Sequence, residues 1–406
     1  MKYFKNTELA QLYHVSEKSV RNWIDAALAG KLDLQLFENN GKHFIANVTK
    51  NTSSIEKLVE KGKKYKNKRG FKAVSPINEF YETYDPKQIL DIVSNISIRH
   101  EIPVQYTYID GGADYWDQYA NRMAQDETPN VLNHTIELLE KSYENIDDLI
   151  DHRKVNIIDL GPGNGLPVRP ILKRMLDQGR LDRYVALDCS REMLDILEKN
   201  INKWFGKSVQ FEGYVRDFSS ERFDDLIRPD FAGNDTEAPV NIVLLFGGTL
   251  SNFRYPDRVL HLLSASLGPN DLLIYSGYLD TPKTRRYFDF DVSGSSNRLT
   301  PKHRLILNYL GIDESAYDVE RVYDEVKRAR SISINPKMDL IINILQGAQT
   351  HSVELRKGEP VLMWRHWHKS AVEVINQFDQ NEFDVMQATK SSDSQHLLVI
   401  SRIKRV

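Results

Sequence analysis

Three closely spaced glycines follow an apolar run at residues 155–165, VNIIDLGPGNG, and this segment limits the folds open to the chain. A continuous apolar run that closes on an acidic residue is typical of a strand buried on both faces of a parallel sheet. The next segment, LPVRPILKRMLDQG, predicts a helix with Ile171, Leu172, Met175 and Leu176 on one side. Strand, glycine turn and helix together predict the first unit of a nucleotide-binding α/β fold, because glycine allows a sharp turn and the close approach of a ligand.

The spacing of these glycines bears on the class of ligand. Dinucleotide-binding folds carry G-x-G-x-x-G against a pyrophosphate, whereas here the spacing is G-x-G-x-G and Asp159 precedes it by two residues. A carboxylate there suits a ligand with an ammonium group and no pyrophosphate, and S-adenosylmethionine (SAM) has a cationic amino acid tail, a sulfonium and a ribose. The next strand, RYVALD, ends at Asp188, near the spacing expected for a ribose-binding acid. Capping of the following helix is the alternative role for Asp188.

Two further segments repeat the arrangement of a strand followed by a turn. VQFEGYVRDFSS places Asp217 and Phe218 after a third strand, and VNIVLLFGGTLSNF is a fourth apolar strand that ends in glycines. Together the segments resemble a class I SAM-dependent methyltransferase. The resemblance implies that Asp217 accepts from the adenine amine and that Phe218 packs on the base; an ordinary loop carboxylate is the alternative for Asp217. The SAM-binding residues that this implies are Asp159, Gly161, Gly163, Gly165, Asp188, Asp217, Phe218 and Gly247.

A narrower resemblance is carried by LLFGGTLSNF and the later LGPNDLLIYSGYLD. Both are similar to the histidine-specific methyltransferase family, which makes trimethylhistidine on the ergothioneine pathway, and the similarity spans about residues 75–406. It implies that Asn252 contacts the amino acid substrate; capping of the helix that begins near Tyr255 is the alternative. Tyr278 and Tyr287 are the other candidate catalytic residues, placed where a lid meets the sheet, with core packing as their alternative.

Two segments depart from the pattern of that family. Where the family has a glutamate and a serine that hold the imidazole, this chain has VLMWRHWHKS, and where the family has Tyr-Tyr-Pro-Thr-Arg-Thr, it has AQDETPN. These departures argue against free histidine and suit an anionic or aromatic acceptor. The simplest interpretation of residues 364–368 is a strand with core tryptophans and solvated polar residues. A metal site is not expected there, because further ligands are not evident.

The first 73 residues differ in charge from the rest of the chain. They carry 15 Lys/Arg and 7 Asp/Glu, a balance of +8; since the whole chain carries −3, the remainder carries −11. Residues 5–28 predict two helices, the second capped by Ser16, and Asn40-Gly41 lies in a predicted hairpin. We expect Leu9, Ala10, Leu12, Val15, Val20, Trp23 and Ile24 to form their shared core.

Two helices followed by a hairpin resemble a winged helix-turn-helix of the MerR/excisionase kind. The resemblance implies DNA contact through Lys18, Ser19, Arg21 and Asn22, with Lys63, Lys64, Lys66, Lys68 and Arg69 of the linker near phosphates. The alternatives are dimerisation, for example as a homodimer, and docking to a partner, with a linker that is simply a solvated tether.

The predicted fold class is therefore α/β: a Rossmann-like class I methyltransferase sheet with an α+β lid or substrate domain and a small N-terminal winged helix-turn-helix. A long apolar segment and a signal-peptide core are both missing from the sequence and Cys189 is the only cysteine, so we expect a cytoplasmic protein without membrane contact. The expected domains are 1–70 (winged helix-turn-helix and basic linker), 71–135 (first part of the lid), 136–280 (SAM-binding core), 281–368 (inserted lid) and 369–406 (final strands).

Three functions remain open at this level. The first is SAM-dependent N-methylation of a small molecule such as an amino acid or related metabolite. The second is a DNA-binding regulator whose methyltransferase-like body senses SAM, and the third is methylation of nucleic acid or protein with the basic module as a tether. The acidic body argues mildly against nucleic acid lying across the active site. In-line transfer needs alignment and water exclusion more than a strict catalytic triad, so no general base is predicted.

Overall fold

The computed structural model describes residues 3–13, 15–67, 70–126, 130–227, 238–288, 297–346 and 349–404, and the side chains of residues 60–67 are outside that description. The chain divides into two compact units. The first comprises Met1–Ile102, Ile306–Asp318 and Ile334–Val361, and the second comprises Pro103–Leu305, Val319–Ser333 and Leu362–Val406. The predicted phosphate contacts of the basic linker lie outside the described residues or side chains, as does part of AQDETPN.

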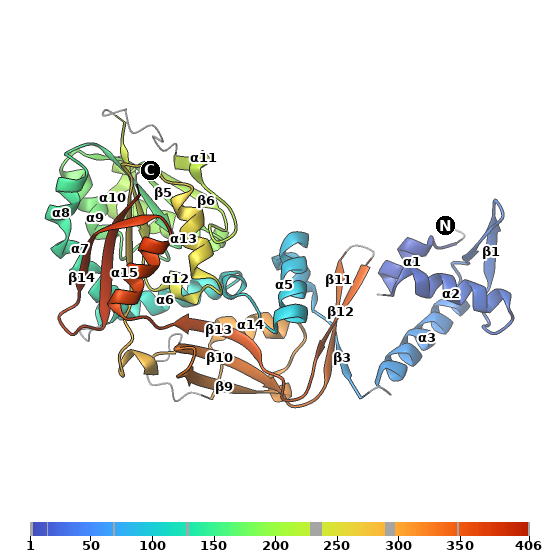
Figure 1. Cartoon of the computed structure of the whole chain (residues 1–406). Helices are drawn as coiled ribbons and strands as arrows, with labels where there is room; N and C mark the ends of the chain where they lie inside the picture. The colour runs from blue at the N-terminus through green and yellow to red at the C-terminus, as the bar shows by residue number, and fades with distance from the viewer. Residues whose placement is uncertain are drawn as a thin grey trace. The chain divides into compact units, whose positions relative to one another are not determined.

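The N-terminal part of the first unit contains two short helices, a hairpin and a longer helix (Figure 1). Their bounds are α1 Asn6–Leu12, α2 Glu17–Leu28, β1 Leu36–Asn39, β2 Lys42–Ile45 and α3 Thr49–Asn67. Ser16 caps α2 as expected, because its Oγ accepts the Ser19 N–H at 3.1 Å. Positive φ angles at Asn40 and Gly41 let the two strands turn back in register.

A small apolar core joins these elements and corrects one expectation. Leu9, Ala10, Val20, Ile24, Leu34, Ile45 and Ile55 are buried together, with Val15 and Trp23 packed against them. Leu12, however, is 59% exposed. It is the last residue of the short helix α1 and lies outside the side packed against α2, so the prediction that it belongs to the core was wrong.

The rest of the first unit combines helices with a three-stranded sheet in the order β12-β11-β3. Its elements are β3 Lys72–Val74, α4 Asn78–Thr83, α5 Pro86–Arg99, η4 Glu314–Ala316, β11 Leu340–Gln346 and β12 Gln349–Leu355. Asp85 fixes the start of α5, since its carboxylate accepts the N–H groups of Lys87 and Gln88. The parallel pairing of β11 with β3 joins segments that are far apart in the sequence.

A seven-stranded sheet forms the centre of the second unit, in the order β14-β15-β8-β7-β4-β5-β6 (Figure 1). Its strands are β4 Val155–Leu160, β5 Leu181–Asp188, β6 Phe211–Val215, β7 Val240–Leu245, β8 Leu272–Tyr278, β14 Phe383–Lys390 and β15 His396–Ile403. The neighbouring strands β8, β7, β4, β5 and β6 are parallel to one another, whereas β15 is antiparallel to both of its neighbours, β8 and β14. This confirms the predicted Rossmann-like sheet.

Helices cover both faces of this sheet. Ile157 of β4 lies in one apolar cluster and Ile158 lies in the other, because successive side chains of a strand point to opposite faces. The first cluster includes residues of α7, α8, α9 and α10, and the second includes residues of α11, α12, α13 and α15. The helices of the second unit are α6 Gly112–Gln125, α7 Val131–Lys141, α8 Tyr143–Leu149, α9 Arg169–Asp177, α10 Arg191–Phe205, α11 Asp224–Ile227, α12 Thr249–Asn252, α13 Pro256–Ser264 and α15 Ala371–Gln380, with the short turns η1 Val104–Tyr108, η2 Gly206–Ser208 and η3 Thr284–Arg286.

The order of connections reverses beside β4, which pairs with β5 on one side and with β7 on the other. In open α/β sheets, ligands bind at the carboxyl ends of the strands next to such a switch point.

The remaining elements are α14 Pro301–Tyr309 and a sheet in the order β13-β10-β9, formed by β9 Tyr317–Asp324, β10 Ala329–Pro336 and β13 Val361–Trp367. None of the helices in the described ranges has the length and apolar character needed to cross a bilayer.

Candidate functional site

A pocket of the second unit lies at the carboxyl ends of β4 to β8. Its wall is formed by the turns after these strands together with side chains of α6, α7, β10 and β13. Of the predicted site residues, those that line it are Asp159, Gly161, Gly163, Asp188, Asp217, Phe218, Gly247, Asn252, Tyr278 and Tyr287. The fold therefore brings the predicted donor-binding and acceptor-binding residues to one cavity.

The turn after β4 shows why glycine is needed there. Gly163 has φ +56°, and a Cβ on it would lie 2.3 Å from the indole Nε1 of Trp116, so glycine lets Trp116 close over the turn. Gly165, by contrast, is not among the described lining residues. It faces the core, where a Cβ would lie 2.5 Å from Leu197 Cδ1.

Two buried carboxylates give the pocket its negative end. Asp159 is 3% exposed and accepts the Tyr184 hydroxyl at 3.1 Å, yet burial raises its pKa to about 7, with a smaller contribution from the charge of Asp188. Burial also raises the pKa of Asp188 to about 6, against a lowering effect of the Ser190 N–H that donates to its Oδ1 at 2.9 Å. A cationic ligand between these groups would favour their charged forms.

The neighbouring turns complete this end of the pocket. Asp217 accepts the Ser219 N–H at 2.9 Å, which is the contact expected of an ordinary loop carboxylate. The same residue also lines the pocket. Phe218 is buried, and its ring lies edge-on to that of Phe253 with centroids 5.7 Å apart. An aromatic face beside a carboxylate can hold a base that carries an exocyclic amine.

The other end of the pocket holds the predicted acceptor-contacting residues. Asn252 Oδ1 lies 3.2 Å from His366 Nδ1, and it does not cap α13, whose first turn has no side-chain cap. The Tyr278 ring packs against Tyr287, His366 and His396 with centroid distances of 5.6, 6.2 and 5.1 Å. Burial raises the pKa of Tyr278, so its hydroxyl stays protonated.

The segment Trp364–His368 corrects a sequence expectation. His366 and His368 are 3% and 4% exposed, so the expectation of solvated polar residues was wrong for both. His366 shares the inward face of β13 with Trp364, and His368 follows directly after the strand. Burial lowers the pKa of both imidazoles, that of His368 to about 3. The described ranges hold no group of three or more His, Cys, Asp and Glu side chains arranged to bind a metal ion.

Several lining residues escaped the sequence analysis, and Arg330 of β10 is the most informative. It is 1% exposed, and its Nε donates to His368 Nε2 at 2.6 Å. Alternation in ARSISINP offered a signal, because Arg330 shares the buried face with Ile332 and Ile334. Trp116, Tyr119 and Phe288 also line the pocket, and their spacing in the sequence does not mark them out.

The predicted DNA-contacting residues lie on α2 of the first unit. Lys18, Arg21 and Asn22 are exposed. Ser19 is half-buried, and its hydroxyl lies 2.9 Å from the Ser16 hydroxyl within the helix cap. Three of the four are therefore accessible to a partner.

The sheet order and the pocket at its switch point are those of class I SAM-dependent methyltransferases. Residues 86–402 match the family described as "Histidine-specific methyltransferase, SAM-dependent". Because this match covers most of the chain, the protein belongs to that family and is an enzyme that uses SAM. Among curated protein sequences, none matches the chain.

Solved structures similar to this one include other methyltransferases. A SAM-dependent methyltransferase from Clostridium acetobutylicum ATCC 824 is 10% identical, with a TM-score of 0.38 over 73% of this chain and 100% of that chain. The CcbJ methyltransferase from Streptomyces caelestis is 13% identical, with a TM-score of 0.39 over 74% and 99% of the two chains. The 1,6-didemethyltoxoflavin-N1-methyltransferase of Burkholderia thailandensis is 11% identical, with a TM-score of 0.35 over 81% and 94%.

Proposed function

We propose that this methyltransferase N-methylates a small molecule, an amine of the amino acid or related metabolite class, and that free histidine is not its preferred acceptor. One observation carries the proposal: a single pocket of the second unit joins the buried acids at the ends of β4 and β5 to Asn252, Tyr278 and His366. Within the described lining, every carboxylate belongs to Asp159, Asp188 or Asp217 at the donor end. The acceptor end instead presents Arg330, which disfavours a cationic imidazolium.

The donor end suits SAM on chemical grounds. Asp159 would hold the ammonium, Asp188 the ribose hydroxyls, and Asp217 with Phe218 the adenine. The raised pKa values of Asp159 and Asp188 support this assignment, because both carboxylates gain from a bound cation. Gly161, Gly163 and Gly247 would let the backbone approach the ligand closely. Bound SAM supplies an electrophilic methyl group on a sulfonium.

The chain's own groups at the acceptor end would orient the amine rather than deprotonate it. His366 is neutral, because burial holds its pKa well below the usual range. If Nδ1–H donates to Asn252 Oδ1, the Nε2 lone pair can accept an N–H of the acceptor; Nε2 makes no hydrogen bond within the described residues. Such a contact fixes the direction of the amine lone pair, and the aromatic walls exclude water.

The closing test of this function follows the methyl group. Purified protein, methyl-labelled SAM and cell extract would be incubated, and the extract then separated into an ultrafiltrate, nucleic acid and protein. We expect label in the ultrafiltrate. Label confined to nucleic acid or protein would refute small-molecule methylation, and SAM binding with no labelled fraction would favour a sensor.

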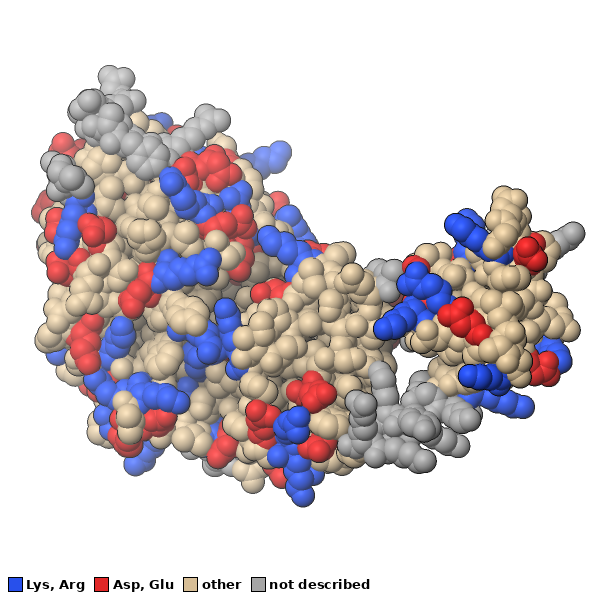
Figure 2. Space-filling model, turned by 45° about the vertical axis from the view of Figure 1, so that its right-hand side comes forward, with Lys and Arg blue, Asp and Glu red and all other residues tan. Residues whose placement is uncertain are grey.

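We propose secondarily that α1, α2 and the β1–β2 hairpin act as a winged helix-turn-helix that contacts DNA. The observation in favour is that Lys18, Arg21 and Asn22 are exposed on the capped helix α2. On the face in view, Figure 2 shows Lys/Arg interspersed with Asp/Glu rather than gathered in one basic surface, so affinity would be modest and sensitive to salt. Fluorescence anisotropy with labelled duplex DNA tests this: K18E/R21E should abolish binding, with K31E/K57E as a control, because Lys31 and Lys57 are exposed and lie outside α1, α2 and the hairpin. Equal binding by both variants would assign the module to dimerisation or docking.

A further inference from the structure

A second pocket of the second unit is formed by the turn between α12 and α13, the turn between β9 and β10, and the segment that leads from β13 into α15. None of the described residues that line it also lines the methyl-transfer pocket. Its volume is about 610 Å³, which is within the range of small-molecule sites. The second pocket is therefore a separate place for a ligand, and its side chains indicate which kind.

Cations are in excess in this second pocket, although the body of the chain is acidic. Five Lys/Arg side chains line it together with two carboxylates, a local balance of +3, whereas residues 74–406 as a whole carry −11. The cations are Arg254, Arg258, Lys327, Arg328 and Lys369, and the carboxylates are Asp257 and Glu373. Such a local reversal of charge favours a negatively charged ligand.

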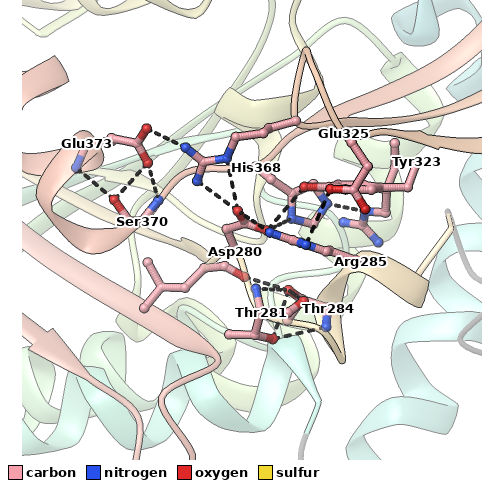
Figure 3. Close-up of polar contacts among 12 residues, drawn as sticks. Asp280, Thr281, Thr284, Arg285, Tyr323, Glu325, His368, Ser370 and Glu373 are labelled. Atoms are coloured by element: carbon pink, nitrogen blue, oxygen red, sulfur yellow. Dashed lines mark hydrogen bonds and ion pairs between the residues drawn. The ribbon is translucent and has the colours of Figure 1, made fainter.

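Both carboxylates of the second pocket are already held by other side chains. Asp257 Oδ1 accepts the side-chain amide of Gln377 at 2.6 Å. Glu373 accepts the backbone N–H and the hydroxyl of Ser370 at 2.7 Å each, and it also accepts from Arg328, as Figure 3 shows for this edge of the ionic cluster. Neither carboxylate is therefore left to pair directly with the remaining cations.

Lys369 and Arg258 are the two cations of this pocket without a direct partner among the described residues. Lys369 is half-buried; burial lowers the pKa of its ammonium, while the charges of Asp257 and Glu373 act in the opposite direction without forming an ion pair. Arg258 is exposed on α13. Because a half-buried ammonium has lost part of its hydration, a bound anion would restore its hydrogen bonds and would gain charge-assisted contacts from both side chains.

Aromatic side chains lie beside these cations. The indole N–H of Trp367 donates to the carbonyl oxygen of Phe253 at 2.8 Å, so what Trp367 offers to a ligand is the apolar surface of its ring. Tyr255 contributes a second ring to the lining and is 53% exposed. Ring surface next to unpaired cations suits an anion that is attached to a flat, apolar group.

We propose that the second pocket binds an oxyanion, a phosphate or a carboxylate, that is carried on a flat apolar group. Lys369 and Arg258 hold the oxyanion, and Trp367 packs against the apolar group. This binding site is separate from the methyl-transfer pocket and requires neither SAM nor the methyl acceptor.

Calorimetric titration of the full-length protein, saturated with SAM, tests this with three probes. Phenyl phosphate and phenylacetate carry the same ring with a phosphate or a carboxylate, and inorganic phosphate has no ring. Lys369→Met removes the charge and keeps much of the apolar side chain, and Arg258→Gln removes a charge at an exposed position where folding is not at risk. Lys199→Met is the matched control, because Lys199 is exposed on α10, which packs on the opposite face of the central sheet from α13.

We expect the aromatic probes to bind, and phenyl phosphate to bind more tightly than inorganic phosphate. Lys369→Met should weaken binding of the aromatic probes by about tenfold or more and Arg258→Gln by about threefold, because the first charge is half-buried and the second is screened by water. Lys199→Met should match wild type. The tighter of the two aromatic probes identifies the oxyanion as a phosphate or a carboxylate.

Two results would overturn the inference. The first is the absence of binding by every probe at millimolar concentration. The second is equal affinity in wild type, Lys369→Met and Arg258→Gln, which would place the anion elsewhere, for example in the methyl-transfer pocket. Unchanged SAM affinity in each variant shows that it is folded, so a loss of anion binding cannot then be ascribed to misfolding.

Discussion

The raised pKa of Asp159 predicts that SAM affinity depends on pH in a defined direction. If the ammonium of SAM binds ionised Asp159, binding competes with protonation of the carboxyl, whose pKa is about 7. Affinity should therefore fall as pH drops. With that pKa, the dissociation constant at pH 5.5 is about 25-fold larger than at pH 7.5, and ionisation of Asp188 with a pKa of about 6 would add roughly a further fourfold.

Isothermal titration calorimetry at several pH values and constant ionic strength measures the dissociation constant of SAM directly. Asp159→Asn is the matched variant, because it keeps the shape of the side chain and cannot ionise. Its affinity should be weaker at pH 7.5, and the 25-fold factor should disappear from its pH dependence. A wild-type dissociation constant that is the same at pH 5.5 and 7.5 would refute the assignment of Asp159 to the ammonium.

Four further predictions follow from named contacts. The pKa of Asp159 in the folded protein lies above the ordinary aspartate value of 3.8, so its ionisation costs stability as pH rises through that interval; Asp159→Asn should raise the Tm of the ligand-free protein at pH 8, and no change would contradict this. Gly163→Ala should weaken SAM binding by about tenfold or more, because its Cβ would meet the Trp116 indole; calorimetry measures this. Gly165→Ala should lower the free energy of unfolding by about 2–4 kcal/mol in urea titrations, against about 1 kcal/mol for Gly179→Ala, which has a similar positive φ and open space around it. His366→Phe should lower kcat by about 100-fold in single-turnover assays and leave SAM affinity unchanged, and an equal loss of both would argue for a structural role only.

The parts of the fold that the sequence predicted are those with local signals. The run VNIIDL, the glycine turn and α9 could be predicted, because a strand buried on both faces is apolar throughout and the turn needs positive φ at successive glycines. The hairpin at Asn40-Gly41 and the helix cap at Ser16 could be predicted for the same reason, because each depends on residues that are close together in the sequence. The acids at the ends of β4 and β5 were predicted from their spacing relative to the glycine turn, which suits a cationic ligand with a ribose.

The parts that escaped prediction depend on contacts between distant segments. Nothing near Arg330 in the sequence indicates that β10 lies beside β13, or that His368 accepts its Nε–H. For the same reason His366 was expected in solvent: alternation along a strand shows which residues share a face, but not which face is covered. Leu12 illustrates the converse error, because an apolar residue in an amphipathic pattern still needs a neighbour to pack against.

The most direct test of the central claim, methyl transfer to the nitrogen of a small molecule, uses SAM with a deuterated methyl group. The full-length protein and an ultrafiltered extract would be incubated, and tandem mass spectrometry would locate the label. We predict a deuterated methyl on the nitrogen of a small-molecule amine. A label found on oxygen or carbon, or only on macromolecules once they are restored to the mixture, would contradict the account.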